Sequence, residues 1–141
     1  MSLHRLGIAT RGPACHEITG EVAGWLRSIR AADGVVTLFV RHTSCSLLIQ
    51  ENADPDVQVD LLACLNRIVP PSDHPTMGWI THRDEGPDDM PAHLKAVVLP
   101  TSLQIPVEAG RMALGRWQGI YLVEHRRHPH RREVLVKFQA G

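Results

Sequence analysis

The amino-acid sequence predicts an α+β fold: a mainly antiparallel, β-sandwich-like sheet with two or three helices. Three observations favour it. The expected elements follow one another as strand, helix, strands, helix, long loop, short helix and strands, and the C-terminal half consists mostly of strand-like segments. The 141 residues are 43% hydrophobic, which is enough for one core. We therefore expect a single domain over residues 1–141.

The N-terminal elements are indicated by hydrophobic periodicity. Residues 3–11 have the alternation of a strand, and residues 19–30 have apolar residues at helical spacing. We expect Gly34 to end this helix with a positive φ. Residues 35–43 form a β-rich segment with His42 at its end, and residues 46–52 form the next strand after a kink.

The clearest helix is expected over residues 54–69. Asp54 suits the N-cap and Pro55 the first helical position. One helical face carries an apolar stripe of Val57, Leu61, Cys64, Leu65 and Ile68. Residues 70–92 then lack a sustained period, and a polar segment of this length is usually functional or disordered.

The remaining elements are a short helix and several strands. Asp89 and Pro91 open the helix, which continues over residues 93–99. Strands are expected over residues 102–107, 117–125 and 133–139. The last two are joined by the basic segment 126–132, which as a hairpin turn would display its charges to solvent. Those arginines could instead hold phosphate.

Composition excludes several classes of protein. Lysine plus arginine and aspartate plus glutamate number 15 each, so nothing indicates binding to nucleic acid or a membrane surface. The three cysteines, Cys15, Cys45 and Cys64, form no CxxC pair and are expected to be free and mostly buried. No apolar run approaches the roughly 18 residues of a membrane span, and no signal peptide is evident. We expect a cytoplasmic location.

Histidines and acids mark the candidate site. His42 is either a core histidine bonded to a backbone carbonyl or a metal or catalytic residue. The segment from His82 to His93 includes Asp84, Glu85, Asp88 and Asp89, and is either a solvated acidic loop or a source of metal ligands. Spacing alone leaves both alternatives open.

Two further residues are candidates for chemistry. Glu124 shares a strand face with Ile120 and Leu122, so its carboxylate needs a partner and could support a site. Cys45 lies near His42 in sequence, but no orienting group is evident for a nucleophile. Glycine-rich nucleotide motifs and HExxH are absent.

The segment from Ser102 to Arg127 resembles the signature of the YjbQ family. The matching residues are Ser102, Ile105, Val107, Gly110, Gly115, Trp117, Gln118 and Ile120, whereas Arg116 replaces the usual threonine. The segments "HTSCSLLIQENADPDVQVDLL" and "HRDEGPDDMPAHLKAVVLPTSL" are also similar to this family. The resemblance covers nearly the whole chain.

This resemblance implies a β-rich α+β fold, a homotrimer and a metal site, with zinc as the expected ion. It implies His42, His82 and His93 as ligands. Candidate surrounding or substrate-binding groups are Asn52, Asp88, Arg116, Gln118, Glu124 and His125, and His125 is also an alternative ligand. The family is further associated with a secondary thiamine-phosphate synthase activity.

Three functions follow as expectations. A synthase would join a pyrimidine-methyl diphosphate to a thiazole phosphate, with Zn²⁺ or Mg²⁺ and arginines at the leaving group. Plausible phosphate partners are Arg83, Arg111, Arg116 and Arg126. A hydrolase of a small ester, lactone or amide would use Glu51 or Asp84 as general base. A closed four-ligand site would indicate a non-enzymatic metal-binding protein.

Overall fold

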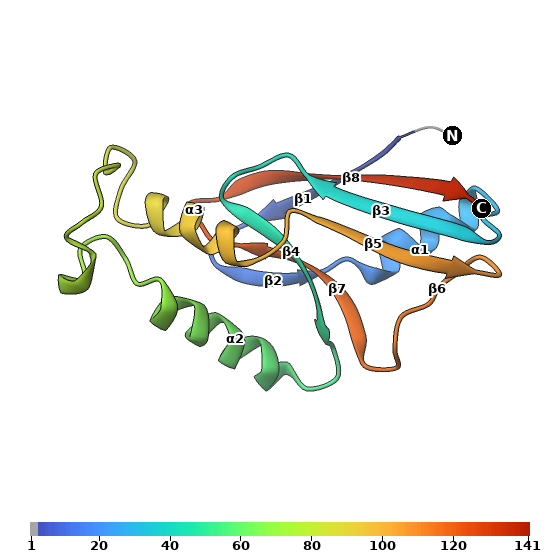
Figure 1. The fold of residues 1–141 in the computed structure, drawn as a ribbon, viewed down its shortest axis with the longest axis horizontal. Coiled ribbons are helices and arrows are strands. Elements are labelled where there is room, and N and C mark those ends of the chain that lie inside the picture. The colour runs from blue at the N-terminus through green and yellow to red at the C-terminus, as the bar shows by residue number, and fades with distance from the viewer. Residues whose placement is uncertain (1–2) are drawn as a thin grey trace.

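Two antiparallel sheets form the body of the protein in a computed structural model that describes residues 3–141 (Figure 1). The elements are β1 (His4–Thr10), β2 (Ala14–Glu17), α1 (Thr19–Ser28), β3 (Gly34–Val40), β4 (Cys45–Glu51), α2 (Pro55–Ile68), a 3₁₀ turn (Pro75–Met77), α3 (Asp89–Val98), β5 (Ser102–Glu108), β6 (Arg111–Met112), β7 (Gln118–Glu124) and β8 (His130–Ala140).

The five-stranded sheet has the order β1-β8-β3-β5-β6, and the three-stranded sheet has the order β2-β7-β4. Every neighbouring pair is antiparallel. With three α-helices added, this confirms the predicted α+β class. The short strand β2 was not predicted, because four residues are too few to show a period.

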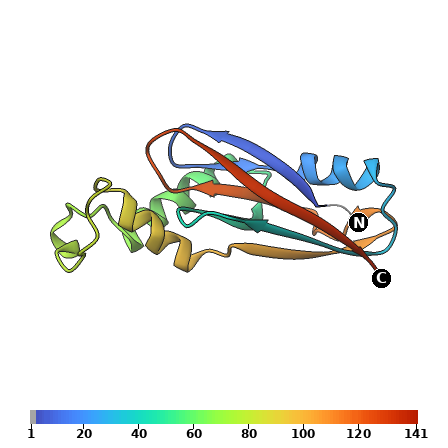
Figure 2. The same ribbon diagram turned by 90° about the horizontal axis from the view of Figure 1, so that it is seen from above.

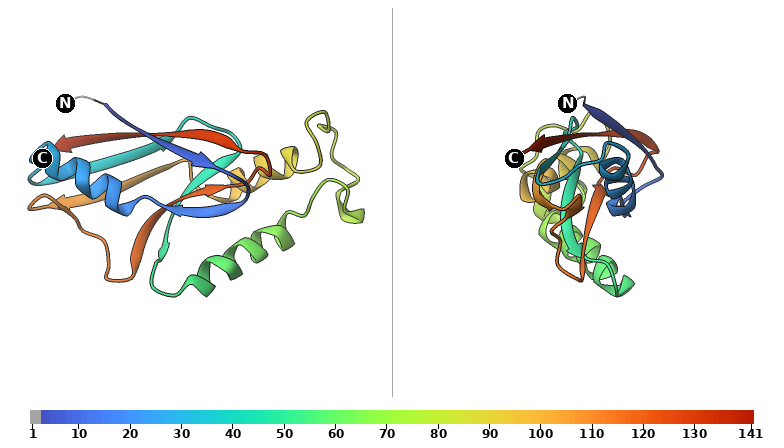
Figure 3. Two further views of the ribbon diagram at one scale, coloured as in Figure 1. Left: turned by 180° about the vertical axis from the view of Figure 1, so that it is seen from behind. Right: turned by 90° about the vertical axis from the view of Figure 1, so that its right-hand side faces the viewer.

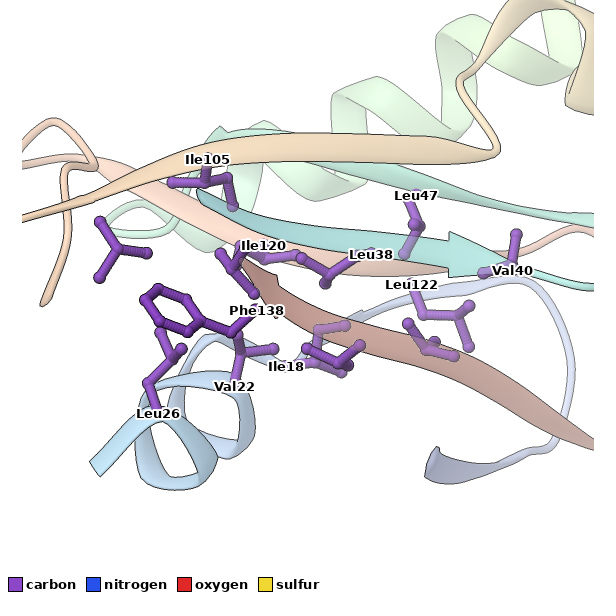
Figure 4. Packing of buried hydrophobic residues seen from close by; sticks show 14 of the residues in the cluster. Ile18, Val22, Leu26, Leu38, Val40, Leu47, Ile105, Ile120, Leu122 and Phe138 are labelled. Carbon is purple, nitrogen blue, oxygen red and sulfur yellow. The ribbon is translucent and has the colours of Figure 1, made fainter. Parts of the chain in front are cut away.

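Figure 2 shows α1 at the end of the molecule where the C-terminus lies. Apolar side chains from both sheets and from α1 pack together in one buried cluster (Figure 4). Val22 and Leu26 of α1 lie close to Phe138 of β8, and all three are buried. Leu38 of β3 and Leu122 of β7 come from opposite sheets and belong to the same cluster. Each fully buried side chain of this size contributes about 1.5–3 kcal/mol relative to exposure.

α2 packs on the three-stranded sheet through a narrower face than its sequence predicts. Leu65 is buried with Tyr121 and Val123, whereas Cys64 and Ile68 of the predicted stripe are exposed. The predicted apolar stripe is wider than the buried face, because one sheet covers this helix on one side only. The predicted cap is confirmed, since the Asp54 side chain accepts a hydrogen bond from the Asp56 N–H at 2.9 Å.

The expected role of Gly34 was wrong. The positive φ after α1 belongs to Arg30, at 55°, while Gly34 is the first residue of β3. Glycine is needed there for another reason: a Cβ would lie 2.1 Å from the Gln139 carbonyl oxygen. Glycine is therefore required at this position because it has no side chain, and not because the backbone is left-handed.

β7 and β8 do not form the hairpin that the sequence suggested. β7 pairs with β2 and β4, whereas β8 pairs with β1 and β3 in the other sheet. The basic segment between them therefore crosses from one sheet to the other. At the same end of the molecule, the segment between α2 and α3 projects away from the sheets (Figure 3).

Candidate metal centre

A histidine and two carboxylates lie together where the projecting segment returns to α3. His82, Glu85 and Asp89 each offer a ligand atom, and these atoms lie within 4.8 Å of one another. His82 and Glu85 are exposed, whereas Asp89, the first residue of α3, is buried. One buried and two exposed ligand groups form an arrangement that could bind a divalent cation.

Arg126 holds the anchored carboxylate. Its Nη1 donates to Asp89 Oδ1 at 2.5 Å and its Nε donates to Asp88 Oδ2 at 3.0 Å. The second Asp89 oxygen lies 2.8 Å from His82 Nε2. Burial alone would raise the pKa of Asp89, but its hydrogen bonds with His82 and Glu85 and the Arg126 charge lower it. Asp89 is therefore an ionised, fixed acceptor.

His93 lies one turn along α3 from Asp89. Its Nδ1 is 2.7 Å from the Asp89 carbonyl oxygen, so this nitrogen donates and Nε2 keeps the lone pair. Nε2 has a 3.3 Å contact with Thr43 Oγ1, and the rings of His82 and His93 are 5.9 Å apart. A donor bond from the other ring nitrogen to a carbonyl is the usual support for a metal-binding histidine.

His42 makes a different contact. Its Nε2 accepts a hydrogen bond from the Glu133 N–H at 2.9 Å, so in the neutral ring the proton is on Nδ1. Burial, together with the Arg132 charge, lowers the pKa of His42. Neither ring nitrogen then offers a free lone pair, and of the three predicted ligands His42 has the weakest geometric support.

A second predicted group lies elsewhere. Glu51 is the last residue of β4 and Asn52 follows it, so both precede α2, whereas His82 follows α2 in the sequence. A 14-residue helix is about 21 Å long. Asn52 donates to Glu17 at 3.0 Å, and Gln118 binds the Gly115 N–H through its side-chain oxygen at 2.7 Å. Within one chain the structure does not bring these residues to His82.

Two of the predicted phosphate-binding arginines are already engaged. Arg83 donates to the backbone carbonyls of Ile80, Ser72 and Met77, and Arg126 binds Asp88, Asp89 and the Glu85 carbonyl. Arg116, the residue that departs from the usual threonine, stacks on Trp117 with its guanidinium carbon 4.9 Å from the ring centroid. Arg111 lines a separate groove against α1.

Glu124 has the partner that its position demanded. Arg132 donates to both carboxylate oxygens at 2.7 and 2.6 Å, and Thr10 adds a hydroxyl donor at 2.6 Å. Burial acts to raise the pKa of Glu124, but the hydrogen bonds from Arg132 and Thr10 lower it. The expectation that the basic segment displays its charges to solvent was therefore wrong for Arg126 and Arg132, because buried carboxylates face them.

Two neighbouring groups are kept neutral by burial. His125 lies with Nε2 2.9 Å from Ser46 Oγ, and burial followed by the Lys95 charge lowers its pKa to about 4. Burial raises the pKa of the Cys45 thiol to about 11, so a nucleophilic thiolate is disfavoured. The other cysteines are less buried than expected: Cys15 is half-buried and Cys64 is exposed.

From the sequence, Glu85 and Asp89 were candidate metal ligands only as members of the segment from His82 to His93, and neither was chosen as a ligand. Asp89 was also expected to open the helix. The available signal was the four-residue spacing of Asp89 and His93, which places both on one helical face. Asp84, the predicted base, is exposed between His82 and Glu85 in the sequence.

Comparisons with known proteins cover nearly the whole chain. Residues 4–141 match the family model described as UPF0047 protein YjbQ-like. A UPF0047 protein of Synechocystis is 45% identical over 93% of this chain and 86% of its own. The UPF0047 protein YjbQ of Escherichia coli O157:H7 is 38% identical, with coverage of 96% and 95%.

Solved structures agree with the fold. A hypothetical protein from Aeropyrum pernix superposes with a TM-score of 0.87 and 25% identity, with all of both chains covered. A conserved hypothetical protein from Thermus thermophilus gives a TM-score of 0.82 and 37% identity over 96% of this chain and 99% of the other. Within residues 3–141, no helix is long and apolar enough to cross a membrane.

Proposed function

Because the chain belongs to the UPF0047 family of YjbQ-like proteins, we propose that it is a metal-dependent enzyme that acts on a small molecule. The observation that carries this proposal is the cluster of His82, Glu85 and Asp89, whose ligand atoms lie within 4.8 Å of one another. His82 and Glu85 are exposed, which leaves the site accessible to substrate.

The donor set favours a transition metal. One imidazole and two carboxylates suit Zn²⁺, Mn²⁺ or Fe²⁺, whereas Mg²⁺ prefers oxygen ligands alone and is the alternative for diphosphate chemistry. His93 does not belong to this cluster, because its Nδ1 donates to the Asp89 carbonyl and its Nε2 lies 3.3 Å from Thr43 Oγ1. Arg126 holds Asp89 in place through a hydrogen bond. A bound divalent cation would supply Lewis-acid charge stabilisation.

The first candidate reaction is thiamine-phosphate synthesis. The thiazole ring nitrogen attacks the methylene carbon of a pyrimidine-methyl diphosphate, the carbon–oxygen bond breaks, and diphosphate leaves with the electron pair. This chain would hold the thiazole phosphate and the diphosphate. Its exposed Glu85 would help to hold the cation that interacts with the diphosphate. The resemblance supports this reaction more than the local geometry does, because Arg83 and Arg126 are bound to protein acceptors.

The geometry itself favours a second candidate, hydrolysis of a small ester, lactone or amide. Such a reaction releases no diphosphate, so it does not require the engaged arginines. Glu85 is exposed and belongs to the cluster, so the carboxylate oxygen that does not bind the cation would accept a proton from an attacking water. Glu85 replaces the distant Glu51 in this role.

Metal binding is tested first, by calorimetric titration of chelator-treated protein with Zn²⁺. We expect stoichiometric binding, weakened at least tenfold in His82→Ala, since one of three ligands is lost. The matched control is His128→Ala, which removes an exposed imidazole outside the cluster. Equal Zn²⁺ affinity in both variants would contradict the proposed site.

Activity assays then separate the reactions. Formation of thiamine phosphate that is lost in His82→Ala and retained in His128→Ala supports the synthase. Chelator-sensitive turnover in an esterase, lactonase and amidase panel, lost in Glu85→Gln, supports the hydrolase. A tightly bound ion with neither activity would leave the non-enzymatic metal-binding alternative.

We also propose a homotrimer, as the resemblance implies. Large apolar side chains that a monomer leaves in water support association, among them Trp79 at 63% and Val97 at 81% exposure. Light scattering coupled to size-exclusion chromatography tests it. A mass near 47 kDa, about three times the 15.7 kDa chain, is expected, and a monomer at micromolar concentration would contradict it.

A further inference from the structure

A cavity of about 230 Å³ lies between α2, α3 and the segment that follows β7. Its polar wall includes Asn66 of α2, Lys95 of α3, and His125 and Arg127 after β7. Asp88 also lines it, while the neighbouring Asp89 belongs to the metal cluster. The cavity is therefore next to the proposed metal centre but is formed by different side chains.

Lys95 is the unusual group in this wall. Only 8% of the residue is exposed, and its ammonium donates to a neutral acceptor, Asn66 Oδ1, at 2.5 Å. Within residues 3–141 its Nζ forms no ion pair with a carboxylate. Buried lysines are normally paired, because an uncompensated charge away from water is unfavourable. Burial first, and then the Arg127 charge, lowers the pKa of Lys95.

Asp88 does not neutralise this lysine fully. Its Oδ2 already accepts hydrogen bonds from Arg126 Nε at 3.0 Å and from the Arg127 N–H at 2.8 Å. Arg126 also binds Asp89, so neither of these carboxylates forms an ion pair with Lys95. The Arg127 guanidinium is exposed, and among the described residues it has no hydrogen-bond acceptor. Lys95 and Arg127 therefore both line the cavity without an ion-pair partner in the described part of the chain.

We propose that this cavity binds a phosphate group, held by Lys95 and Arg127. An ammonium and a guanidinium are the side chains that proteins use for phosphate oxygens. The volume is below the 300–1,000 Å³ typical of sites for drug-sized ligands, which favours a small anion or one phosphate group of a larger molecule. His125 adds a neutral polar wall, since its pKa is about 4.

This binding does not depend on the metal centre. The phosphate partners are outside the set of His82, Glu85 and Asp89, so phosphate affinity should survive removal of divalent metal. Failure of the metal proposal and failure of the phosphate proposal are therefore separate results. If both proposals hold, the cavity would place a phosphate group beside the metal-dependent reaction.

The test is calorimetric titration of the full chain with inorganic phosphate, at constant ionic strength and with a chelator present. We expect saturable binding that Lys95→Met and Arg127→Ala each weaken at least tenfold. Arg111→Ala is the matched control, because this exposed arginine lines a different groove. No saturable binding by the wild type, or wild-type affinity in both cavity variants, would overturn the proposal.

Two further measurements keep the result interpretable. Phosphate should raise the melting temperature of the wild type and leave that of Lys95→Met unchanged, whereas a purely structural lysine would give equal shifts. If Lys95→Met does not fold, phosphate titration of Arg127→Ala tests the proposal, because Arg127 is exposed and its loss should not affect folding. Glycerol phosphate, titrated in parallel, separates the sources: binding at least as tight as that of inorganic phosphate assigns the cavity to a phosphomonoester, and weaker binding assigns it to the free ion.

Discussion

Two clusters of ionisable side chains lie near one end of the sheets, and they are built in opposite ways. Glu124, Arg132 and Thr10 form a closed network in which every member is buried and hydrogen-bonded. His82 and Glu85 are exposed around one anchored carboxylate. The closed network joins β7 of one sheet to β8 and β1 of the other.

The difference shows that the surroundings of a charged side chain determine whether it stabilises the fold or can bind a ligand. A carboxylate inside the core is tolerated because Arg132 and Thr10 satisfy it, and nothing is left to bind a ligand. The Asp89 carboxylate at the start of α3 is held on one side by Arg126, and its exposed neighbours His82 and Glu85 remain free to bind a cation. We call these three residues the open cluster. We therefore expect the closed network to control stability and the open cluster to control cation binding.

The largest effect is expected from Arg132→Met. The substitution leaves Glu124 buried without its cation, which should lower the free energy of unfolding by about 3–5 kcal/mol. Urea denaturation measures the change. Exposed Arg131→Met is the control, and the double variant Arg132→Met/Glu124→Leu should recover much of the loss. A single-variant loss below about 1 kcal/mol would contradict the structural role.

The next effect is a pH dependence from His125. The unfolded chain protonates this histidine near pH 6.5, whereas the fold delays protonation to about pH 4. Between these values the unfolded state binds more protons, so stability falls as the pH drops from 6.5 to 4 and is unaffected above 6.5. Wild type should lose about 2–3 kcal/mol more than His125→Gln across this window. Parallel pH profiles in chemical denaturation would contradict it.

Asp89→Asn should have an intermediate effect, because Asp89 is shared by the Arg126 anchor and the open cluster. Loss of one charge-assisted hydrogen bond should lower the free energy of unfolding by about 1–3 kcal/mol. Zn²⁺ binding should be lost in the same calorimetric assay. The control is Asp84→Asn, an exposed acid of the same loop. Unchanged Zn²⁺ affinity in Asp89→Asn would separate the anchor from the metal site.

His82→Ala should have the smallest effect on stability. The side chain is about half exposed, at 49%, and surface substitutions usually change the free energy of unfolding by less than about 0.5 kcal/mol. Thermal unfolding without metal should match wild type, although Zn²⁺ affinity falls. A large loss of stability would place His82 with the closed network instead.

Local signals accounted for most of the elements. Asp54 and Pro55 identified the start of α2 because capping depends on residues next to one another in sequence. The spacing of Val22 and Leu26 identified α1 for the same reason. Pairing between distant strands has no such local signal, so the separation of β7 and β8 into two sheets was missed.

For the site, sequence alone determined the segment that includes His82, Glu85, Asp89 and His93, since acids and imidazoles concentrate there. It also determined that Glu124 would need a partner, because strand alternation directs its side chain inward. Only the tertiary structure decided that Arg132 is that partner and that Arg126 anchors Asp89. The physical reason is that an ion pair depends on distance in space, whereas Arg132 and Arg126 are 8 and 37 residues away from Glu124 and Asp89 in the sequence.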